Sequence, residues 1–184
     1  RRYCRGGLVR HFMRDSFFRL PLGMSYRPFD ELAILERLTE HGVAVPKPVV
    51  GAVRHWLCGW AYRAILVTEE LPEVRNLLFL ALTAKLQSEE QTAVAELCKK
   101  AGAEAAKMVA LQVAHPDLHL GNVLVQREDR VVLIDFDRAV IAPEMTKERL
   151  QQSLITRWNR SLVKHGVTDF ALGAFEAGLR GEVG

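Results

Sequence analysis

The sequence predicts an α+β fold in which a small β-sheet lobe precedes a mostly helical lobe. β-branched and apolar residues concentrate in two short runs upstream of Thr68. Long stretches with helical periodicity dominate the chain from Glu89 onwards. Strands that come first and helices that come later are typical of α+β domains, in which the two kinds of element segregate.

The sheet lobe is predicted to contain one helix and two strands. The helix begins at Pro28 and its apolar pattern stops at Gly42, a residue that often follows a helix end. Val49–Val53 and Ala61–Val67 are rich in β-branched residues and are predicted to form a hairpin. Thr68–Pro72 is expected to connect this lobe to the next.

The two lobes are predicted to cover residues 1–71 and 72–184. In the second lobe, Glu89–Gln112 gathers its apolar residues on one face, as an amphipathic helix does. Lys147–Lys164 and Phe170–Leu179 are predicted to be the closing helices.

Composition excludes several classes of protein. The chain has 184 residues, of which 49% are hydrophobic and 26% charged, and this is globular composition. The net charge of +3 gives no reason to expect a nucleic-acid partner. The 3 cysteines are scattered, which argues for a reducing compartment and against a disulfide scaffold or zinc site. The strongest apolar run, Leu77–Leu82, is too short to span a bilayer.

Two segments carry residues with recognisable chemistry. The first reads His-Pro-Asp-Leu-His-Leu-Gly-Asn from His115 to Asn122 and is predicted to be a loop between a helix and a strand. The second, Val131–Phe136, is an apolar strand that places the carboxylate of Asp135 near its end. The strands Asn122–Val125 and Val131–Phe136 form a predicted hairpin. The spacing H-x-D-x-x-x-x-N, followed by an apolar strand ending in Asp-Phe, matches the kinase signature.

In that signature each polar residue has a defined role. Asp117 is the catalytic base that accepts the proton of the attacking hydroxyl. Asn122 and Asp135 hold the Mg²⁺ that bridges the phosphates of ATP, since hard cations prefer oxygen ligands. His115 is expected to fix the loop by hydrogen bonds. The alternative is that Asp117 and Asn122 are turn residues and Asp135 a capping or turn acid.

Departures from the protein-kinase pattern narrow the function. Pro116 stands where many protein kinases have the arginine that reads a phosphorylated activation loop. Asp137 replaces the glycine of D-F-G, and only a short segment separates Asp135 from Pro143, with no A-P-E after it. These departures argue against a regulated protein kinase and favour small-molecule or lipid-sugar kinases of this fold.

The chain resembles the bacterial lipopolysaccharide kinases, and within them the 3-deoxy-D-manno-octulosonic acid (Kdo) kinases. Arg1–Val9, Arg27–Pro48 and Val131–Arg138 carry this resemblance, which extends over nearly the whole chain. It implies a two-lobed, protein-kinase-like fold whose N-terminal sheet lobe is truncated, with the phosphate-covering loop expected upstream of Arg1. It also implies ATP-dependent phosphorylation of a Kdo hydroxyl on a lipid A precursor.

The resemblance to kinases implies further nucleotide-binding residues. Glu31, on the early helix, is expected to pair with a cation from a strand, for which Arg1 is the nearest candidate. Glu69 and Leu71 lie in the connector and are expected to contact adenine through backbone groups. The alternatives are a solvent-facing Glu31 and an ordinary surface connector.

The acceptor side is less sharply defined by the sequence. Arg138 is a candidate for binding a substrate phosphate or the Kdo carboxylate, because arginine binds such groups in bidentate fashion. His119 is a candidate for contacting the substrate, and its alternative is a structural loop histidine. The resemblance places the protein peripherally at the cytoplasmic face of the bacterial inner membrane. There the arginines between Arg1 and Arg27 are expected to contact the anionic surface.

Two other functions stay open at this point. Aminoglycoside and choline kinases often place a histidine two residues after the base, as in Asp117-Leu118-His119, so a kinase for a soluble alcohol is the enzymatic alternative. The non-enzymatic alternative is an inactive kinase-like binding module, which would be favoured if the phosphate loop expected upstream of Arg1 is missing from the protein.

Overall fold

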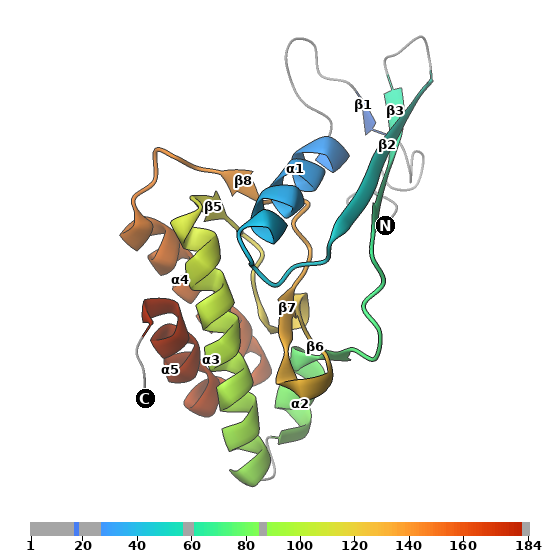
Figure 1. Cartoon of the computed structure of the whole chain (residues 1–184). Helices are drawn as coiled ribbons and strands as arrows, with labels where there is room; N and C mark the ends of the chain where they lie inside the picture. The colour runs from blue at the N-terminus through green and yellow to red at the C-terminus, as the bar shows by residue number, and fades with distance from the viewer. Residues whose placement is uncertain (1–16, 19–26, 57–60, 85–87, 182–184) are drawn as a thin grey trace.

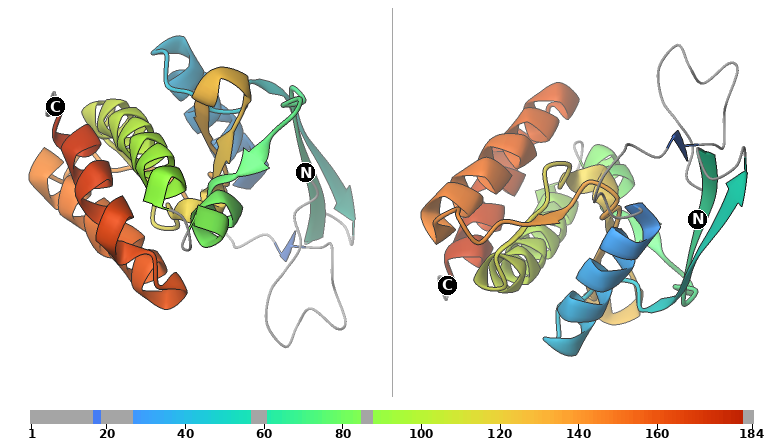
Figure 2. Two further views of the ribbon diagram at one scale, coloured as in Figure 1. Left: turned by 90° about the horizontal axis from the view of Figure 1, so that it is seen from below. Right: turned by 90° about the horizontal axis from the view of Figure 1, so that it is seen from above.

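A small sheet with one helix stands apart from a bundle of three helices, and a short hairpin lies between them (Figures 1 and 2). This computed structural model describes residues 17–18, 27–56, 61–84 and 88–181. Across these ranges the order of elements is the predicted one, with the first strands and helix followed by the helical part. Arg1, Gly59 and Trp60 lie outside the described residues.

The first sheet is built on one long hairpin. β2 (Pro48–Trp56) and β3 (Ala61–Thr68) pair antiparallel, with a register shift between Pro48 and Val50. β1 (Phe17–Phe18) pairs with the other edge of β3, so the strand order is β1-β3-β2. Both strands of the predicted hairpin are therefore confirmed, with slightly longer bounds.

Helix α1 (Arg27–Glu40) packs against this sheet through its apolar stripe. Ile34, Leu35 and Leu38 are buried, as their helical spacing requires. The helix is followed by Gly42, whose φ of 69° lies in the left-handed region that glycine adopts at low cost. The predicted stop is confirmed, and the reversal sends the chain on towards β2.

The connection between the sheet and the helices contains two elements that periodicity does not predict. β4 (Arg75–Asn76) has only two residues, and α2 (Leu77–Thr83) is apolar almost all round. Asn76 caps α2, because its side-chain oxygen accepts a hydrogen bond from the Leu78 amide at 3.0 Å. Its side-chain amide donates to the Gly121 carbonyl at 2.9 Å, which ties the start of α2 to the loop that precedes β6.

The short hairpin predicted between residues 122 and 136 is present. β6 (Val123–Val125) and β7 (Val131–Leu133) pair antiparallel, and β4 adds to the outer edge of β6. A one-turn 3-10 helix, η5 (Arg127–Asp129), connects β6 to β7. A second 3-10 turn, η4 (Leu120–Asn122), leads into β6.

Three helices form the far side of the molecule. α3 (Ser88–Ala110), α4 (Lys147–His165) and α5 (Thr168–Arg180) confirm the predicted helices to within a few residues. α3 and α5 approach closely because each presents a glycine to the other helix. A Cβ on Gly102 would overlap the Phe175 carbonyl oxygen, and a Cβ on Gly178 would overlap that of Lys99.

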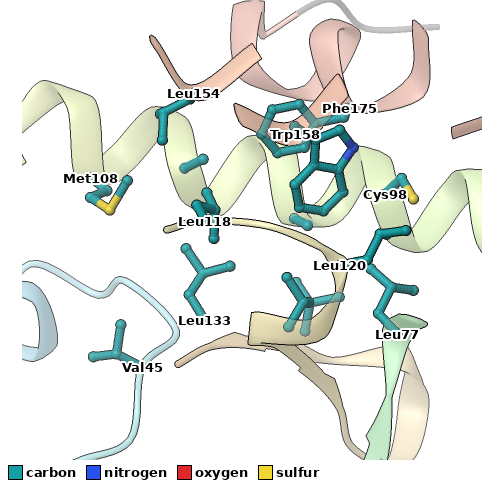
Figure 3. Close-up of a cluster of buried hydrophobic side chains, with 14 of the residues drawn as sticks. Val45, Leu77, Cys98, Met108, Leu118, Leu120, Leu133, Leu154, Trp158 and Phe175 are labelled. Carbon is teal, nitrogen blue, oxygen red and sulfur yellow. The ribbon is translucent and has the colours of Figure 1, made fainter. Parts of the chain in front are cut away.

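The core joins these helices to the central loop and hairpin. The Trp158 ring of α4 stacks on Phe175 of α5, with centroids 4.1 Å apart and planes 10° apart. Figure 3 shows this pair above Leu118, Leu120 and Leu133, all of which are fully buried. None of the helices in the described ranges is long and apolar enough to cross a membrane.

A last short pair of strands closes the region around the loop. β5 (Val113–Ala114) pairs antiparallel with β8 (Val140–Ile141). Because His115 follows β5 and Arg138 lies just before β8, this pairing brings the start of the first motif segment, at His115, close to the end of the second, at Arg138. The assignment of residues 1–71 and 72–184 to two lobes stays a prediction.

The close approach of α3 and α5 makes Gly178 a specific determinant of stability. Gly178→Ala is expected to lower the free energy of unfolding by about 1–3 kcal/mol or more, because its methyl group meets the Lys99 backbone and no flexible side chain. Gly173→Ala on the same helix is the matched control, since no described atom lies within 4 Å of its added Cβ. It is expected to stabilise by roughly 0.5–1 kcal/mol through helix propensity. Urea unfolding of both variants measures the difference, and equal effects would contradict the packing argument.

Candidate active site

The loop His115–Asn122 is here called the HxD loop. It is held in place because two of its leucines, which alternate with polar residues, are buried. Leu118 and Leu120 are fully buried in the core, whereas Asp117, His119 and Asn122 are only partly buried. Apolar anchoring of this kind holds the polar side chains between the leucines at defined positions. The Asn122 side-chain amide adds a bond within the loop, donating to the Asp117 carbonyl at 3.0 Å.

His115 joins the HxD loop to the segment that follows β7. Its Nε2 lies 3.2 Å from the Ile134 carbonyl oxygen, and its ring meets Phe136 edge-on with centroids 4.7 Å apart. Because a carbonyl only accepts, Nε2 carries the proton of this bond. Nδ1 is buried without a partner among the described residues, so protonating it would create an unsatisfied donor. This is the structural role that the sequence predicts for His115.

Burial lowers the pKa of His115 below its ordinary value of 6.5. The side chain is only 3% exposed, and desolvation of the charged form is the largest cause of the shift. The bond to Ile134 and the charges of Asp135 and Asp117 oppose the shift without reversing it. His115 is therefore neutral at physiological pH.

Asp135 is held in an unusual backbone conformation. Its φ is 73°, a left-handed value that costs a non-glycine residue on the order of 1 kcal/mol. The Ile134 amide just before it donates to the Asn122 carbonyl at 3.0 Å, which joins the end of β7 to the start of β6. Such strained residues cluster at functional sites, where the surrounding structure enforces them.

One cavity of about 330 Å³, here called the central cavity, brings three of the predicted residues together. Glu31 comes from α1, Asn122 from the HxD loop and Asp135 from the end of β7. Leu66 and Thr68 of β3 complete the wall on the sheet side. Glu31 is only 4% exposed, so it is not the solvent-facing glutamate of the alternative interpretation. These polar groups are far apart in sequence and meet only because the sheet with α1 faces the short hairpin.

The connector residues lie elsewhere. Glu69 and Leu71 line a separate groove of about 730 Å³. Glu69 pairs with Lys47 at 2.9 Å, and its backbone amide donates to the Lys47 carbonyl at 2.8 Å. The backbone amide of Glu69 is therefore already used in a hydrogen bond at the edge of the sheet. Of the two predicted adenine contacts, Leu71 is the one whose backbone amide makes no such hydrogen bond among the described residues. The cation proposed to pair with Glu31, Arg1, falls outside the described residues.

Asp117 is held by two arginines. Arg138 Nη1 donates to its Oδ2 at 2.9 Å, and Arg157 Nε lies 3.7 Å from its Oδ1. Arg138 is thus next to the predicted base, as its candidacy for substrate binding requires. Arg157 belongs to α4 and was missed by the sequence analysis, because no local pattern links a helix arginine to a distant loop.

His119 shapes the HxD loop in this structure. Its Nδ1 accepts a hydrogen bond from the Gly121 amide at 3.0 Å and so caps η4. Partial burial lowers the pKa of His119, and the positive charge of Arg157 lowers it further. Contact between His119 and a substrate stays a prediction.

The donor set in the central cavity fits a magnesium ion. The Asn122 amide nitrogen is already bonded to Asp117, which leaves the amide oxygen as the available ligand beside the Asp135 carboxylate. No group of three or more His, Cys, Asp and Glu side chains is placed to share a metal in the described ranges. Mg²⁺ suits this sparse arrangement, because it keeps several waters and takes its other ligands from substrate phosphates.

Comparison with known proteins decides the family. The sequence model of the lipopolysaccharide kinase (Kdo/WaaP) family matches residues 1–178. The chain belongs to this family. The 3-deoxy-D-manno-octulosonic acid kinase of Vibrio cholerae is 30% identical over 95% of this chain and 70% of its own length. The kinase of the same name from Pasteurella multocida is 33% identical over 88% of this chain and 64% of its own length.

The fold of this chain is also found in a solved structure. WaaP, from a structure described as WaaP in complex with acyl carrier protein, superimposes with a TM-score of 0.66 at 20% identity. The match covers 84% of this chain and 66% of WaaP, and it confirms the predicted α+β, protein-kinase-like fold. Membership of the family confirms the predicted class, a phosphotransferase with an alcohol acceptor in lipopolysaccharide biosynthesis, and implies the use of ATP.

The lowered pKa of His115 predicts a pH-dependent stability. Between the folded pKa and 6.5 the unfolded chain binds more protons, so the free energy of unfolding falls as the pH drops from neutral through 6.5. His115→Asn should show a shallower fall over that range in urea titrations, whatever its stability at neutral pH. His119→Asn is the control, and its slope should change less because His119 is less buried. Equal slopes for wild type and His115→Asn would contradict the buried, neutral imidazole.

Proposed function

We propose that this chain carries the catalytic centre of an ATP-dependent kinase that phosphorylates a Kdo hydroxyl on a lipid A precursor. One observation carries the proposal: Asn122 and Asp135 line a single cavity, and Asp117 lies on the same HxD loop as Asn122. The name that the Vibrio and Pasteurella relatives share favours Kdo as the acceptor sugar. The chain spans roughly two thirds of the length of these relatives, so its substrates are part of the proposal.

The central cavity is proposed to receive the nucleotide. Leu66 and Phe136 give it apolar walls suited to a base, and Asn122 and Asp135 lie on the same lining as ligands for the metal. Bound there, Mg²⁺ would neutralise charge on the phosphates of ATP. Glu31 adds a buried carboxylate from α1, positioned to orient a cation that contacts the same phosphates.

Asp117 is proposed to orient the acceptor hydroxyl and accept its proton. Its carboxylate is presented by the HxD loop, whose leucine anchors hold it in place before the substrate arrives. Arg138 and Arg157 pair with the two carboxylate oxygens and would place positive charge near the phosphoryl group during transfer. Most of the acceleration in such a site comes from positioning and electrostatic stabilisation.

The acceptor also suggests where the protein works. A lipid A precursor is embedded in a membrane, so the enzyme is proposed to act peripherally at the cytoplasmic face of the inner membrane. The arginines from Arg1 to Arg27 are proposed to contact its anionic surface, and the side chains of all of them lie outside what the structure describes.

The acceptor is tested directly with radiolabelled ATP. Label is expected to transfer from the γ-phosphate to a Kdo-bearing lipid A precursor, and not to kanamycin or choline under the same conditions. Transfer confined to the soluble alcohols would replace the lipopolysaccharide substrate with the enzymatic alternative. Tight nucleotide binding without transfer to any acceptor would favour an inactive binding module.

The roles of the two aspartates are separable. Asp117→Asn is expected to lower kcat by about 10²–10⁴-fold while leaving nucleotide affinity nearly unchanged, because it removes the base and not a phosphate contact. Asp135→Asn is expected to weaken magnesium-dependent nucleotide binding, measured by isothermal titration calorimetry. Glu96→Gln, which removes an exposed carboxylate from α3 outside both the central cavity and the groove of Glu69 and Leu71, is the control and should behave as wild type. Full turnover by Asp117→Asn would show that the base is another group.

A further inference from the structure

A second depression, here called the α4 groove, opens beside the HxD loop. Its volume is about 650 Å³, and most of its lining comes from one face of α4. Pro116, the residue before Asp117, forms part of its wall. None of its lining residues also lines the central cavity, so the groove is a separate site next to the proposed base.

The charge of the α4 groove is entirely positive. Arg149, Arg157 and Arg160 line it, and no acidic residue does so among the described part of the chain. Arg149 and Arg160 are exposed, and within the described ranges neither has a carboxylate within ion-pair distance. Like charges on one helix face repel one another, which costs a few tenths of a kcal/mol for each close pair. A bound anion would remove this repulsion.

Arg157 connects the groove to the chemistry. It lines the α4 groove and also lies 3.7 Å from Asp117 Oδ1. A molecule that fills the groove therefore lies within reach of the proposed base. Gln152, Ser153 and Thr156 add neutral hydrogen-bonding groups between the arginines, which suits a sugar bearing hydroxyls.

We propose that the α4 groove binds the oxyanion groups of the acceptor and so selects an acidic sugar over a neutral one. This inference rests on the proposed function and assigns its acceptor subsite. Arg149 and Arg160 supply guanidinium forks at two points along the groove, and each fork matches carboxylate and phosphate oxygens of the acceptor. Arg157 aligns the bound sugar with Asp117. The anion is either the Kdo carboxylate or a phosphate of the lipid A portion, two groups with the same recognition chemistry.

The test compares acceptor binding and turnover in groove variants. Arg149→Gln and Arg160→Gln should each raise the KM for the Kdo-bearing lipid A precursor about tenfold, and the double variant more, with kcat and the KM for ATP nearly unchanged. The same variants should weaken binding of the detergent-dispersed acceptor without ATP, measured by microscale thermophoresis. Lys147→Gln removes one charge from α4 outside the groove and should leave both measurements unchanged.

Two modified acceptors identify the anion. If the groove holds a phosphate, removing the phosphates of the acceptor abolishes the difference between wild type and the double variant. If it holds the carboxylate, converting the Kdo carboxyl group to an amide does so. A difference that survives both changes, or equal acceptor affinity of wild type and the double variant, would overturn the groove proposal.

If the proposed kinase function is wrong, the result differs from the one expected if only the groove proposal is wrong. Wild-type protein would then transfer no phosphate to the Kdo-bearing acceptor. The binding measurement without ATP still decides the groove, because it needs no turnover. Wild-type binding that the double variant loses supports the subsite, and equal binding by the two proteins overturns it.

Discussion

The backbone of Ile134 is the point on which the site depends. Its amide donates to the Asn122 carbonyl, and its carbonyl accepts from the His115 ring, so both ends of the HxD loop are bonded to one residue. Asp135 comes next, and its left-handed backbone turns the chain out of β7. These two bonds extend the β6–β7 pairing, in which Val123 already lies opposite Leu133, to both ends of the loop. With them, Asn122 and Asp135 face one cavity.

The apolar core makes this arrangement rigid. Leu118 and Leu120 alternate with the polar residues of the HxD loop and are fully buried against the helices, near the stacked pair of Trp158 and Phe175 (Figure 3). The glycine contacts between α3 and α5 allow the helices to pack closely beneath that pair. Packing of these apolar side chains therefore holds the polar side chains in position before a substrate binds. That is the condition for catalysis by orientation.

The HxD loop also separates two electrostatic environments. On one side lies the central cavity, with the oxygen atoms of Glu31, Asn122 and Asp135 suited to a cation. On the other lie Arg138, Arg157 and the remaining arginines of the α4 groove, suited to an anion. Asp117 stands between them, paired to the arginines through its carboxylate and to Asn122 through its backbone. A magnesium nucleotide and an acidic acceptor would thus bind at separate sites next to the proposed base.

Periodicity and short spacings are local properties, so they predicted helices α1, α3, α4 and α5, the β2–β3 hairpin, the kinase signature and the family. The sequence also pointed to Asp117, Asn122, Asp135 and Glu31. The three-dimensional fold was needed to show that the last three share a cavity and that Arg157 reaches Asp117 from a distant helix. It alone revealed α2, β4 and the β5–β8 pair, since two-residue strands form only where a partner is already in place. Contacts between remote segments depend on packing of the whole chain, and no local pattern encodes them.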